Sequence, residues 1–299
     1  MMLNNLIKIS DCSSEDLNNI INLGIDFKDG KKSDSLKNKS AVLLFDKPSL
    51  RTKLSFMIGV KKLGGYPVYF SPEEVGMGVR EPIEDVSSVV SRMADIAIIR
   101  TFEQEKIELF EKYSKVPVIN ALTDDEHPCQ ALADVMTITE KVGTVKDKTI
   151  TFIGDSNNVA KSLAYAVLSL GGNFNIASPK GYEFNKSTIN YFNKLSGGNF
   201  NSYDNMMEPA KNSDIIYTDV WASMGQESEK KKRLNDFSKF QVSSSVLDNA
   251  NKNVKFMHDL PAHPGEEIEE GLLYDPRSIV FDQAENRLWA QTGLMDYIL

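Results

Sequence analysis

Several features are scarce in this chain of 299 residues, and each absence excludes a class of protein. Only two cysteines occur, Cys12 and Cys129, which excludes a disulfide-built secreted domain and a cysteine-rich metal site. No apolar run reaches the length that a membrane-spanning helix requires. The first residues lack a basic segment followed by a long apolar run, so no secretory leader is expected. We therefore expect the chain to act in the reducing cytoplasm.

An excess of positive charge is also missing. The formal net charge is −8, whereas proteins that bind nucleic acid or acidic membranes are usually basic. The chain is 41% hydrophobic and 25% charged, which is typical of a soluble globular protein and argues against extended disorder. An anionic ligand would need a local pocket of basic side chains, because the chain as a whole is acidic.

The pattern of residues 41–63 predicts a short strand, a loop and a helix that follow one another directly. Backbone N–H groups and the positive end of the helix dipole suit an anion of phosphate type at the helix start. Hydroxyls and cations stand at this point: Ser49, Arg51, Thr52 and Lys53. The competing interpretation is a helix capped by Ser49 with its cations in solvent, but cations in a first turn oppose the dipole and need a compensating anion.

Apolar runs alternate with helical patterns along the whole chain, which predicts an α/β protein of two domains, each a parallel sheet flanked by helices. We expect domains at residues 1–140 and 141–283. The predicted strands are 41–45, 66–70, 95–100, 116–122, 149–153, 173–177, 214–221, 254–260 and 278–281. The predicted helices are 5–23, 50–63, 83–94, 103–113, 128–142, 157–170, 187–195 and 284–299. Ser13 or Ser14 is an alternative start of the first helix. Mobile segments are expected at 72–82 and 228–237.

Ligands of open parallel sheets bind beyond the carboxyl ends of the strands. Polar side chains follow the predicted strands at those ends, and we expect them to form two facing walls of one cleft between the domains. Besides the loop at 49–53, they are Arg100, His127, Gln130, Asn157, Asn158, Asp219 and Asp259.

Three of these residues suit a carbonyl substrate with an oxyanion. Arg100 ends a buried strand, so its guanidinium must find either a structural carboxylate or an oxyanion ligand. His127 precedes a proline-started helix, where it is either a cap or surface residue or a donor that polarises a carbonyl. Gln130 lies one turn on and could bind an amide NH₂ through its carbonyl oxygen. The other histidines, His258 and His263, are expected to be structural or to lie at the rim.

Residues 151–158 combine a strand, a glycine, a loop and a helix start, as in dinucleotide-binding folds. They lack the G-x-G-x-x-G motif. Asn157 and Asn158 stand where glycine is needed for the backbone to approach a pyrophosphate closely, so we expect no nicotinamide cofactor. The two asparagines either cap the helix or bind an α-carboxylate. Asp219, after the next buried strand, either belongs to a turn or holds an α-ammonium group.

Taken together, these segments resemble the aspartate/ornithine carbamoyltransferase family in its ornithine-type form. The likeness spans residues 46–287 and keeps the family's order of motifs. The matching segments are Lys-Pro-Ser-Leu-Arg-Thr-Lys-Leu-Ser-Phe at 47–56, His-Pro-Cys-Gln-Ala-Leu-Ala-Asp at 127–134, Gly-Asp-Ser-Asn-Asn-Val-Ala at 154–160, Asp-Val-Trp-Ala-Ser-Met-Gly at 219–225 and Phe-Asp-Gln-Ala-Glu-Asn-Arg-Leu at 281–288.

The resemblance implies transfer of a carbamoyl group from carbamoyl phosphate to the δ-amine of L-ornithine, without metal or organic cofactor. It implies carbamoyl-phosphate binding by Ser49, Leu50, Arg51, Thr52, Lys53, Arg100, His127, Pro128, Cys129, Gln130, Leu260 and Arg287. It implies catalysis by Arg51, Thr52, Arg100, His127, Gln130 and Asp259, and ornithine binding by Asn158, Asp219, Ser223, Met224, Asp259 and Leu260. It further implies that helix 284–299 packs back on the first domain, and that the chain forms a homotrimer or a multiple of one, with residues 76–80 reaching a neighbour.

The sequence departs from the family pattern at a few positions. Lys53 stands where arginine is usual, and Met57 where glutamate often follows. The usual His-Cys-Leu-Pro is His-Asp-Leu-Pro at 258–261. A carboxylate beside the δ-ammonium would raise the pKa of that amine, yet only the neutral amine attacks. Asp259 therefore acts as a general base or lowers turnover, and the alternatives are another amine acceptor, such as an acylated ornithine or a diamine, and a non-catalytic carbamoyl-phosphate-binding relative.

Overall fold

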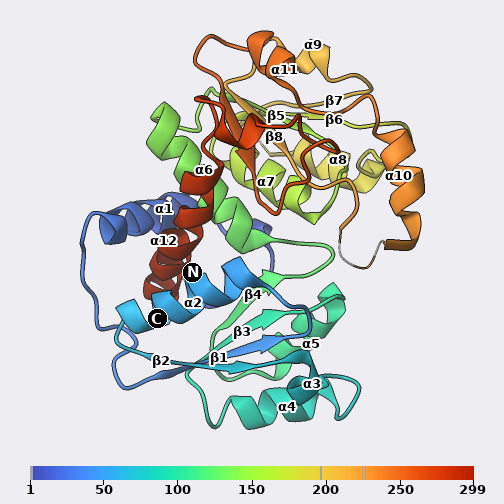
Figure 1. Ribbon diagram of the computed structural model, residues 1–299. Helices are drawn as coiled ribbons and strands as arrows, with labels where there is room; N and C mark the ends of the chain where they lie inside the picture. The colour runs from blue at the N-terminus through green and yellow to red at the C-terminus, as the bar shows by residue number, and fades with distance from the viewer. Residues whose placement is uncertain (1–2, 196, 224, 226) are drawn as a thin grey trace. The chain divides into compact units, whose positions relative to one another are not determined.

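The computed structural model describes residues 3–195, 197–223, 225 and 227–299. The chain divides into two compact units, each built on one parallel sheet (Figure 1). Unit 1 comprises residues 1–136, 161–166 and 285–299, and unit 2 comprises residues 137–160 and 167–284. The prediction of an α/β protein with two parallel sheets flanked by helices is confirmed.

The sheet of unit 1 has the strand order β2-β1-β3-β4. Its strands are β1 (Ser40–Phe45), β2 (Tyr66–Phe70), β3 (Ile96–Arg100) and β4 (Val118–Leu122). The central strands β1 and β3 are almost continuously apolar and buried, as expected for parallel strands covered on both faces. Phe45 pairs with Arg100, so the segments that follow β1 and β3 leave the sheet at the same edge.

Helices cover this sheet. Those of unit 1 are α1 (Ser14–Lys28), α2 (Leu50–Lys62), α3 (Pro72–Val75), α4 (Ile83–Val90) and α5 (Gln104–Tyr113), with the 3₁₀ turn η1 (Ile9–Asp11). Helix α6 (Pro128–Val142), α7 (Asn158–Ser169) and α12 (Val280–Ile298) contribute residues to both units. Buried side chains such as Ile99 and Phe110 form the core between the sheet and its helices.

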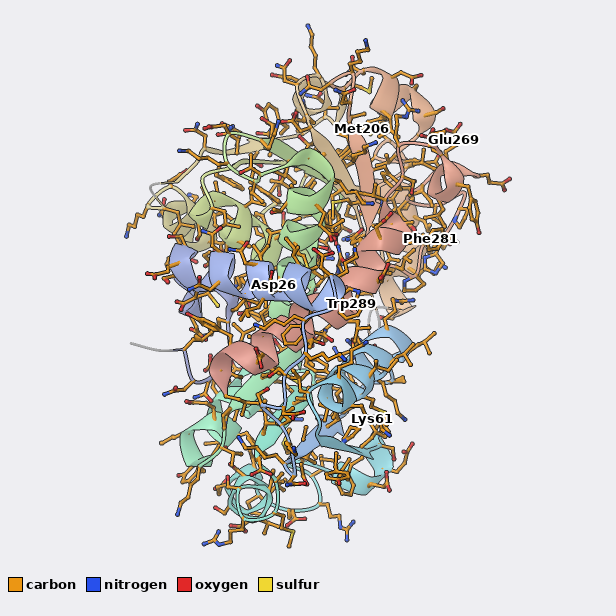
Figure 2. The ribbon with its side chains drawn as sticks, turned by 90° about the vertical axis from the view of Figure 1, so that its left-hand side faces the viewer. Asp26, Lys61, Met206, Glu269, Phe281 and Trp289 are labelled. Carbon is orange, nitrogen blue, oxygen red and sulfur yellow. The ribbon has the colours of Figure 1, made fainter. Side chains whose placement is uncertain are left out.

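The end of α12 packs closely on α1 within unit 1. Figure 2 shows the two helices side by side, labelled at Trp289 and Asp26. A Cβ on Gly293 would lie 2.7 Å from the backbone nitrogen of Gly24, so only glycine permits this approach without a backbone shift. The close contact fixes the part of α12 that carries Arg287.

Unit 2 has the strand order β7-β6-β5-β8-β9. Its strands are β5 (Thr149–Ile153), β6 (Asn173–Ala177), β7 (Phe200–Tyr203), β8 (Ile215–Thr218) and β9 (Lys255–His258). Its other elements are α8 (Lys186–Phe192), α9 (Met207–Ala210), α10 (Lys230–Asp236), α11 (Ser244–Asp248), η2 (Glu227–Glu229) and η3 (Leu272–Tyr274). Ile153, Ile216 and Phe256 belong to its buried core.

Some predicted elements are wrong. The helix expected at 5–23 has no helical turn at residue 5: it begins at the alternative start, Ser14, because Ser13 caps it by accepting the Asp16 N–H, and it continues to Lys28. The strand expected at 278–281 is absent: Ser278 makes one isolated bridge and α12 begins at Val280. The mobile segment expected at 228–237 contains helix α10, and the loop at 72–82 contains helix α3. In the described part of the chain, no helix is long and apolar enough to cross a membrane.

Candidate active site

In unit 1, one arginine links three motifs that are far apart in the sequence. Arg287 on α12 donates from Nη1 to Gln130 Oε1 at 2.6 Å and from Nη2 to Thr52 Oγ1 at 3.0 Å. Gln130 also donates from Nε2 to Asp134 Oδ1 at 2.8 Å. All these residues are buried. The three motifs thus meet in one hydrogen-bonded cluster, as a shared ligand site requires.

The cluster adjoins the capped start of α2. The Ser49 hydroxyl accepts the Thr52 N–H at 3.3 Å, so Ser49 is the N-cap of this helix. Arg51 and Lys53 lie in the first helical turn, and both are partly buried. The Lys53 ammonium lies 3.3 Å from the centroid of the Tyr69 ring. The predicted arrangement of cap, hydroxyl and cations at one helix start is present.

His127 is a buried, neutral imidazole. Burial, followed by the charges of Arg287, Arg100 and Lys47, holds the pKa of His127 well below its usual value of 6.5. Its Nδ1 atom is buried and has no hydrogen-bond partner among the described residues. A neutral imidazole next to three cations can donate one N–H to a carbonyl oxygen while those cations attract an anion.

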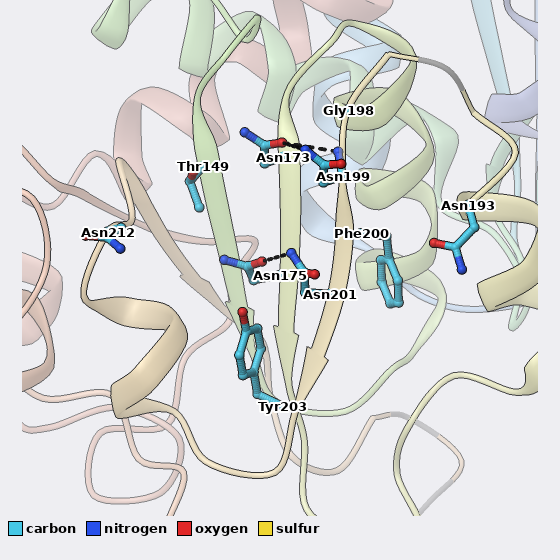
Figure 3. Close-up of a pocket in the computed structure, with 10 residues that line it drawn as sticks. All are labelled: Thr149, Asn173, Asn175, Asn193, Gly198, Asn199, Phe200, Asn201, Tyr203 and Asn212. Atoms are coloured by element: carbon cyan, nitrogen blue, oxygen red, sulfur yellow. Dashed lines mark hydrogen bonds between the residues drawn. The ribbon is translucent and has the colours of Figure 1, made fainter.

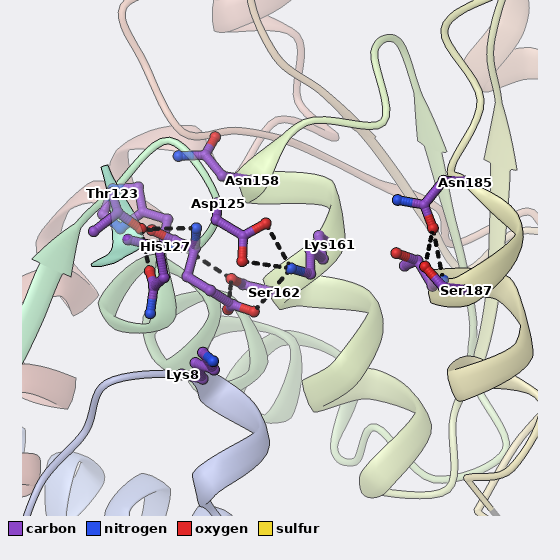
Figure 4. Close-up of polar contacts among 12 residues, drawn as sticks. Lys8, Thr123, Asp125, His127, Asn158, Lys161, Ser162, Asn185 and Ser187 are labelled. Atoms are coloured by element: carbon purple, nitrogen blue, oxygen red, sulfur yellow. Dashed lines mark hydrogen bonds and ion pairs between the residues drawn. The ribbon is translucent and has the colours of Figure 1, made fainter. Parts of the chain in front are cut away.

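A polar network holds the backbone of His127 in place (Figure 4). The His127 N–H donates to Ser162 Oγ at 2.9 Å, and Ser162 Oγ donates to Glu126 Oε2 at 2.5 Å. Burial raises the pKa of Glu126. Lys161 pairs with Asp125 at 2.8 Å. This support could not be predicted from the sequence, because Ser162 lies on α7 and nothing in its spacing points to His127.

Two more buried cations lie in unit 1. Arg100, at the end of β3, is 5% exposed. Lys47 is 4% exposed, pairs with Asp124 and lies 4.1 Å from the centroid of the Phe102 ring. Lys47 was not among the predicted site residues, although it opens the loop motif. Lys47 is a candidate ligand residue because it is a buried cation, and its burial cannot be seen in the sequence.

Three predicted ligand residues offer little side-chain chemistry. Cys129 is buried, its thiol donates to the Asn120 carbonyl at 3.2 Å, and burial raises its pKa to about 12. Pro128 has no polar side chain, and the Leu50 side chain is 75% exposed. These residues can serve a ligand only through their backbone or by shaping the loop.

In unit 2, the predicted acceptor residues gather around Asp219. Asn157 caps α7 by accepting the Ala160 N–H at 3.0 Å, and its Nδ2 donates to Asp219 Oδ2 at 2.7 Å. The Val220 N–H donates to Asp219 Oδ1 at 2.6 Å. Asn158 begins α7, and Ser223 is partly buried. Met224 lies outside the described residues. Asn157 therefore acts as the helix cap, one of the two roles expected for it, and its unforeseen bond to Asp219 joins the two motifs.

Asp259 lies beside Asp219. One oxygen from each carboxylate and a ring nitrogen of His258 all lie within 4.8 Å of one another. Burial and then the neighbouring Asp259 raise the pKa of Asp219 well above its usual value of 3.8. His258 Nδ1 accepts the Leu260 N–H at 2.9 Å, and His258 Nε2 lies 3.1 Å from Glu267 Oε1. Burial opposes a charged ring, but the neighbouring Asp259 and Glu267 raise the pKa of His258 to about 9, and a ring that keeps its protons is a poor third metal ligand.

Comparison with known proteins settles the family. The profile of the aspartate/ornithine carbamoyltransferase carbamoyl-P binding domain matches residues 4–140, and that of the Asp/Orn binding domain matches residues 146–298. The chain belongs to the aspartate/ornithine carbamoyltransferase family. The resemblance inferred from the five motifs is thereby confirmed.

Individual carbamoyltransferases match over nearly the whole chain. Ornithine carbamoyltransferase of Psychrobacter cryohalolentis is 43% identical over 100% of this chain and 98% of its own. The structure of the Pyrococcus furiosus ornithine carbamoyltransferase has a TM-score of 0.93 at 40% identity, covering 98% of this chain and 96% of its own. The anabolic enzyme of Campylobacter jejuni has a TM-score of 0.94 at 30% identity, covering 99% of both chains.

A polar hollow outside the residues described above carries no comparable chemistry. It lies on unit 2 at the edge strand β7, and asparagines line most of it (Figure 3). The amide of Asn201 donates to Asn175 at 3.1 Å, and that of Asn199 donates to Asn173 at 3.0 Å. None of the described residues that line the hollow is charged, so we assign it no catalytic role.

Proposed function

We propose that this family member transfers the carbamoyl group of carbamoyl phosphate to the δ-amine of L-ornithine, giving L-citrulline and phosphate. The observation that carries the proposal is the cluster in unit 1: a neutral, buried His127 beside Arg100, Lys47 and Arg287. An electrophilic carbonyl attached to a phosphate needs this combination of donor and cations. The names of the relatives support ornithine as the acceptor.

The residues of unit 1 would serve carbamoyl phosphate. Ser49, Arg51, Thr52 and Lys53 hold the phosphate at the start of α2, where the helix dipole adds to their charges. Thr52, Arg100 and His127 polarise the carbonyl oxygen and stabilise the oxyanion of the tetrahedral intermediate. Gln130 and the backbone of Leu260 bind the NH₂ end. Arg287 keeps Thr52 and Gln130 in position.

The residues of unit 2 would serve ornithine. Asn158 binds the α-carboxylate, and Asp219 binds the α-ammonium group, with Ser223 and Met224 completing the clamp. The nitrogen of the δ-amine then forms a bond to the carbamoyl carbon while the bond from that carbon to the phosphate oxygen breaks. Positioning and oxyanion stabilisation supply the acceleration, and no metal or organic cofactor takes part.

We propose that the domains lie at residues 1–140 and 141–283, with 284–299 completing the first. We also propose a homotrimer or a multiple of one. Large apolar side chains stay exposed on α2 and the edge strand β2 within unit 1, which supports burial against another copy: Leu50, Leu54, Ile58, Tyr66, Val68 and Phe70. The buried free thiols Cys12 and Cys129 support a cytoplasmic location.

The test is formation of a ureido product and of phosphate from carbamoyl phosphate, with L-ornithine, N-acetylornithine, putrescine and aspartate as parallel acceptors. We expect turnover with L-ornithine alone. Turnover with a different acceptor would replace ornithine in the proposal. Binding of carbamoyl phosphate without turnover of any acceptor would show a non-catalytic relative.

A further inference from the structure

One turn of unit 2, which the proposed reaction does not use, gathers an imidazole and two carboxylates. One ligand atom from each of His263, Glu266 and Glu267 lies within 4.8 Å of the others. The three residues stand close together in the chain, so the local conformation of this turn sets their spacing. An imidazole nitrogen with two carboxylate oxygens is a donor set that binds divalent metal ions.

Backbone hydrogen bonds hold the turn in place. The Glu266 N–H donates to the His263 carbonyl at 2.9 Å, which closes the turn. The Val242 N–H donates to the Glu267 carbonyl at 2.9 Å and ties the turn to another segment of unit 2. Gly265 has a φ of +91°, a left-handed conformation that glycine adopts without strain. The turn is therefore formed before any ligand arrives.

Glu267 carries a buried oxygen that calls for a cation. Its side chain is fully buried. Oε1 accepts the His263 N–H and lies 3.1 Å from His258 Nε2. Oε2 has no hydrogen-bond partner in the described ranges 3–195, 197–223, 225 and 227–299. A buried carboxylate oxygen without a donor is costly, and a bound cation would remove that cost.

The ring of His263 lies beside this oxygen at the spacing of two metal ligands. Its Nδ1 is 3.6 Å from Glu267 Oε2, which is too long for a hydrogen bond. Zinc bonds of about 2.0–2.2 Å at a tetrahedral angle place two ligand atoms about 3.4 Å apart. The His263 side chain is 45% exposed, so an ion can reach the pair from solvent.

Glu266 offers the third ligand from the rim of the turn. Its side chain is 27% exposed, and its Oε1 pairs with Lys230 Nζ at 2.9 Å. The Lys230 side chain is 49% exposed, and an ion pair this open to solvent contributes little stability. The lysine therefore competes only weakly with a divalent cation for this carboxylate.

We propose that His263, Glu266 and Glu267 bind one divalent transition-metal ion, and that zinc suits the donor set best. An imidazole ligand favours zinc over magnesium and calcium, which prefer oxygen ligands alone. The two carboxylates balance the charge of the ion, and water completes a tetrahedral shell. The ion joins the exposed ring of His263 to the buried Glu267 and so stiffens the turn.

This site differs from the pair of acceptor carboxylates. Asp219 and Asp259 form another group of possible ligands with His258. Asp259 and Glu267 raise the pKa of His258 to about 9 against the effect of burial, and a ring that keeps its protons does not bind a cation. The proposal therefore predicts that zinc affinity depends on His263 and not on Asp259.

The first arm of the test is equilibrium dialysis of the full chain against Zn²⁺ at pH 7.5, without substrates. We expect about one tightly bound ion per chain, and none when Mg²⁺ replaces Zn²⁺ at the same concentration. His263→Ala and Glu266→Gln each remove one ligand and leave the buried Glu267 intact. Each should weaken zinc binding by about 10²-fold or more, because even the loss of an outer-shell partner costs about 10–100-fold.

Two carboxylate variants serve as controls. Asp204→Asn removes an exposed carboxylate of unit 2, and Asp259→Asn removes one from the other group. Both should keep the zinc affinity of the wild type within about twofold, the typical scatter for distant, independent sites. Thermal melting of the metal-free proteins, followed by circular dichroism, should give His263→Ala and Glu266→Gln the midpoint of the wild type, which shows that both are folded.

The second arm removes the competing lysine. Lys230→Ala frees the Glu266 carboxylate, and we expect zinc affinity to rise about twofold to fivefold, the strength of an exposed ion pair. Lys231→Ala is the matched control, because Lys231 is the next residue of α10 and is also exposed. Equal affinities of the two lysine variants would contradict the assignment of Glu266 as a ligand.

The remaining outcomes decide the proposal. Binding of one zinc ion by the wild type, with the expected losses in His263→Ala and Glu266→Gln, supports it. Absence of zinc binding by the wild type overturns it, and so does an unchanged affinity in His263→Ala. Loss of binding in Asp259→Asn overturns it by placing the ion at the acceptor carboxylates. No arm measures citrulline, so these results do not depend on the proposed function.

Discussion

The polar sites of the two units differ in how far they are built before a ligand binds. In unit 1 the side chains already bond to one another: Arg287 holds Thr52 and Gln130, and Ser162 holds the backbone of His127. In unit 2 the carboxylates of Asp219 and Asp259 crowd together, and burial and then this neighbour raise the pKa of Asp219. The first site is preorganised for an anion, and the second gains its compensation from a cationic substrate.

Breaking the arginine link should damage the first site most. Arg287→Ala removes the donor to Thr52 and Gln130, and we expect kcat/KM for carbamoyl phosphate to fall by about 10² to 10³-fold. L-norvaline has the carbon skeleton of ornithine without the side-chain amine, and its affinity, a property of unit 2, should change far less. The control is Arg92→Ala, which should keep full activity. Arg92 is an exposed arginine of unit 1, and among the contacts described its side chain bonds only to the Ser88 carbonyl. Equal losses in both variants would show that the link has no special role.

Removing the support of His127 should have a smaller effect. Ser162→Ala leaves the His127 N–H and Glu126 without this partner, and we expect it to cost about 1–3 kcal/mol of unfolding free energy, measured by urea denaturation. Activity should fall less than in Arg287→Ala, because Ser162 does not face the ligand site directly. Ser88→Ala is the matched control, because Ser88 is a partly exposed serine on helix α4 of unit 1. An unfolding free energy equal to that of the control would show that the Ser162 hydrogen bonds add no stability.

The smallest expected effect is on the pH dependence of stability. The folded pKa of His127 lies below its value in the unfolded chain, so the unfolded state binds more protons as the pH falls below about 6.5. His127 therefore favours the folded state fully above that pH and lowers stability below it. Between pH 7.5 and 5.5, His127→Asn should lose about 1 kcal/mol less unfolding free energy than the wild type. Identical slopes would mean that His127 titrates normally.

Some elements could be predicted from strand-forming residues or from apolar residues at helical spacing. The strand at 66–70 and the helix at 128–142 agree with β2 and α6 residue for residue. The strand β7 escaped prediction, because its asparagine and serine side chains show no apolar alternation. The segment at 278–281 was wrong, because a short apolar run suits a buried helix start as well as a strand.

The same limit applies to the site. Motif residues such as Arg287 and Asp219 could be selected from the chain, because their neighbours in sequence form recognisable patterns. Contacts made across the fold could not: Ser162 holds His127 from another helix, and Asn157 reaches Asp219 from another loop. The burial of Lys47 depends on tertiary packing, which no spacing in the sequence reveals.

The central claim is that the start of α2 binds and activates carbamoyl phosphate. The most direct test is citrulline formation by Arg51→Ala beside Lys61→Ala, a cation at the opposite end of the same helix. We expect kcat/KM for carbamoyl phosphate to fall by about 10²-fold or more in Arg51→Ala and to stay near the wild-type value in Lys61→Ala. Full activity of Arg51→Ala would contradict the claim.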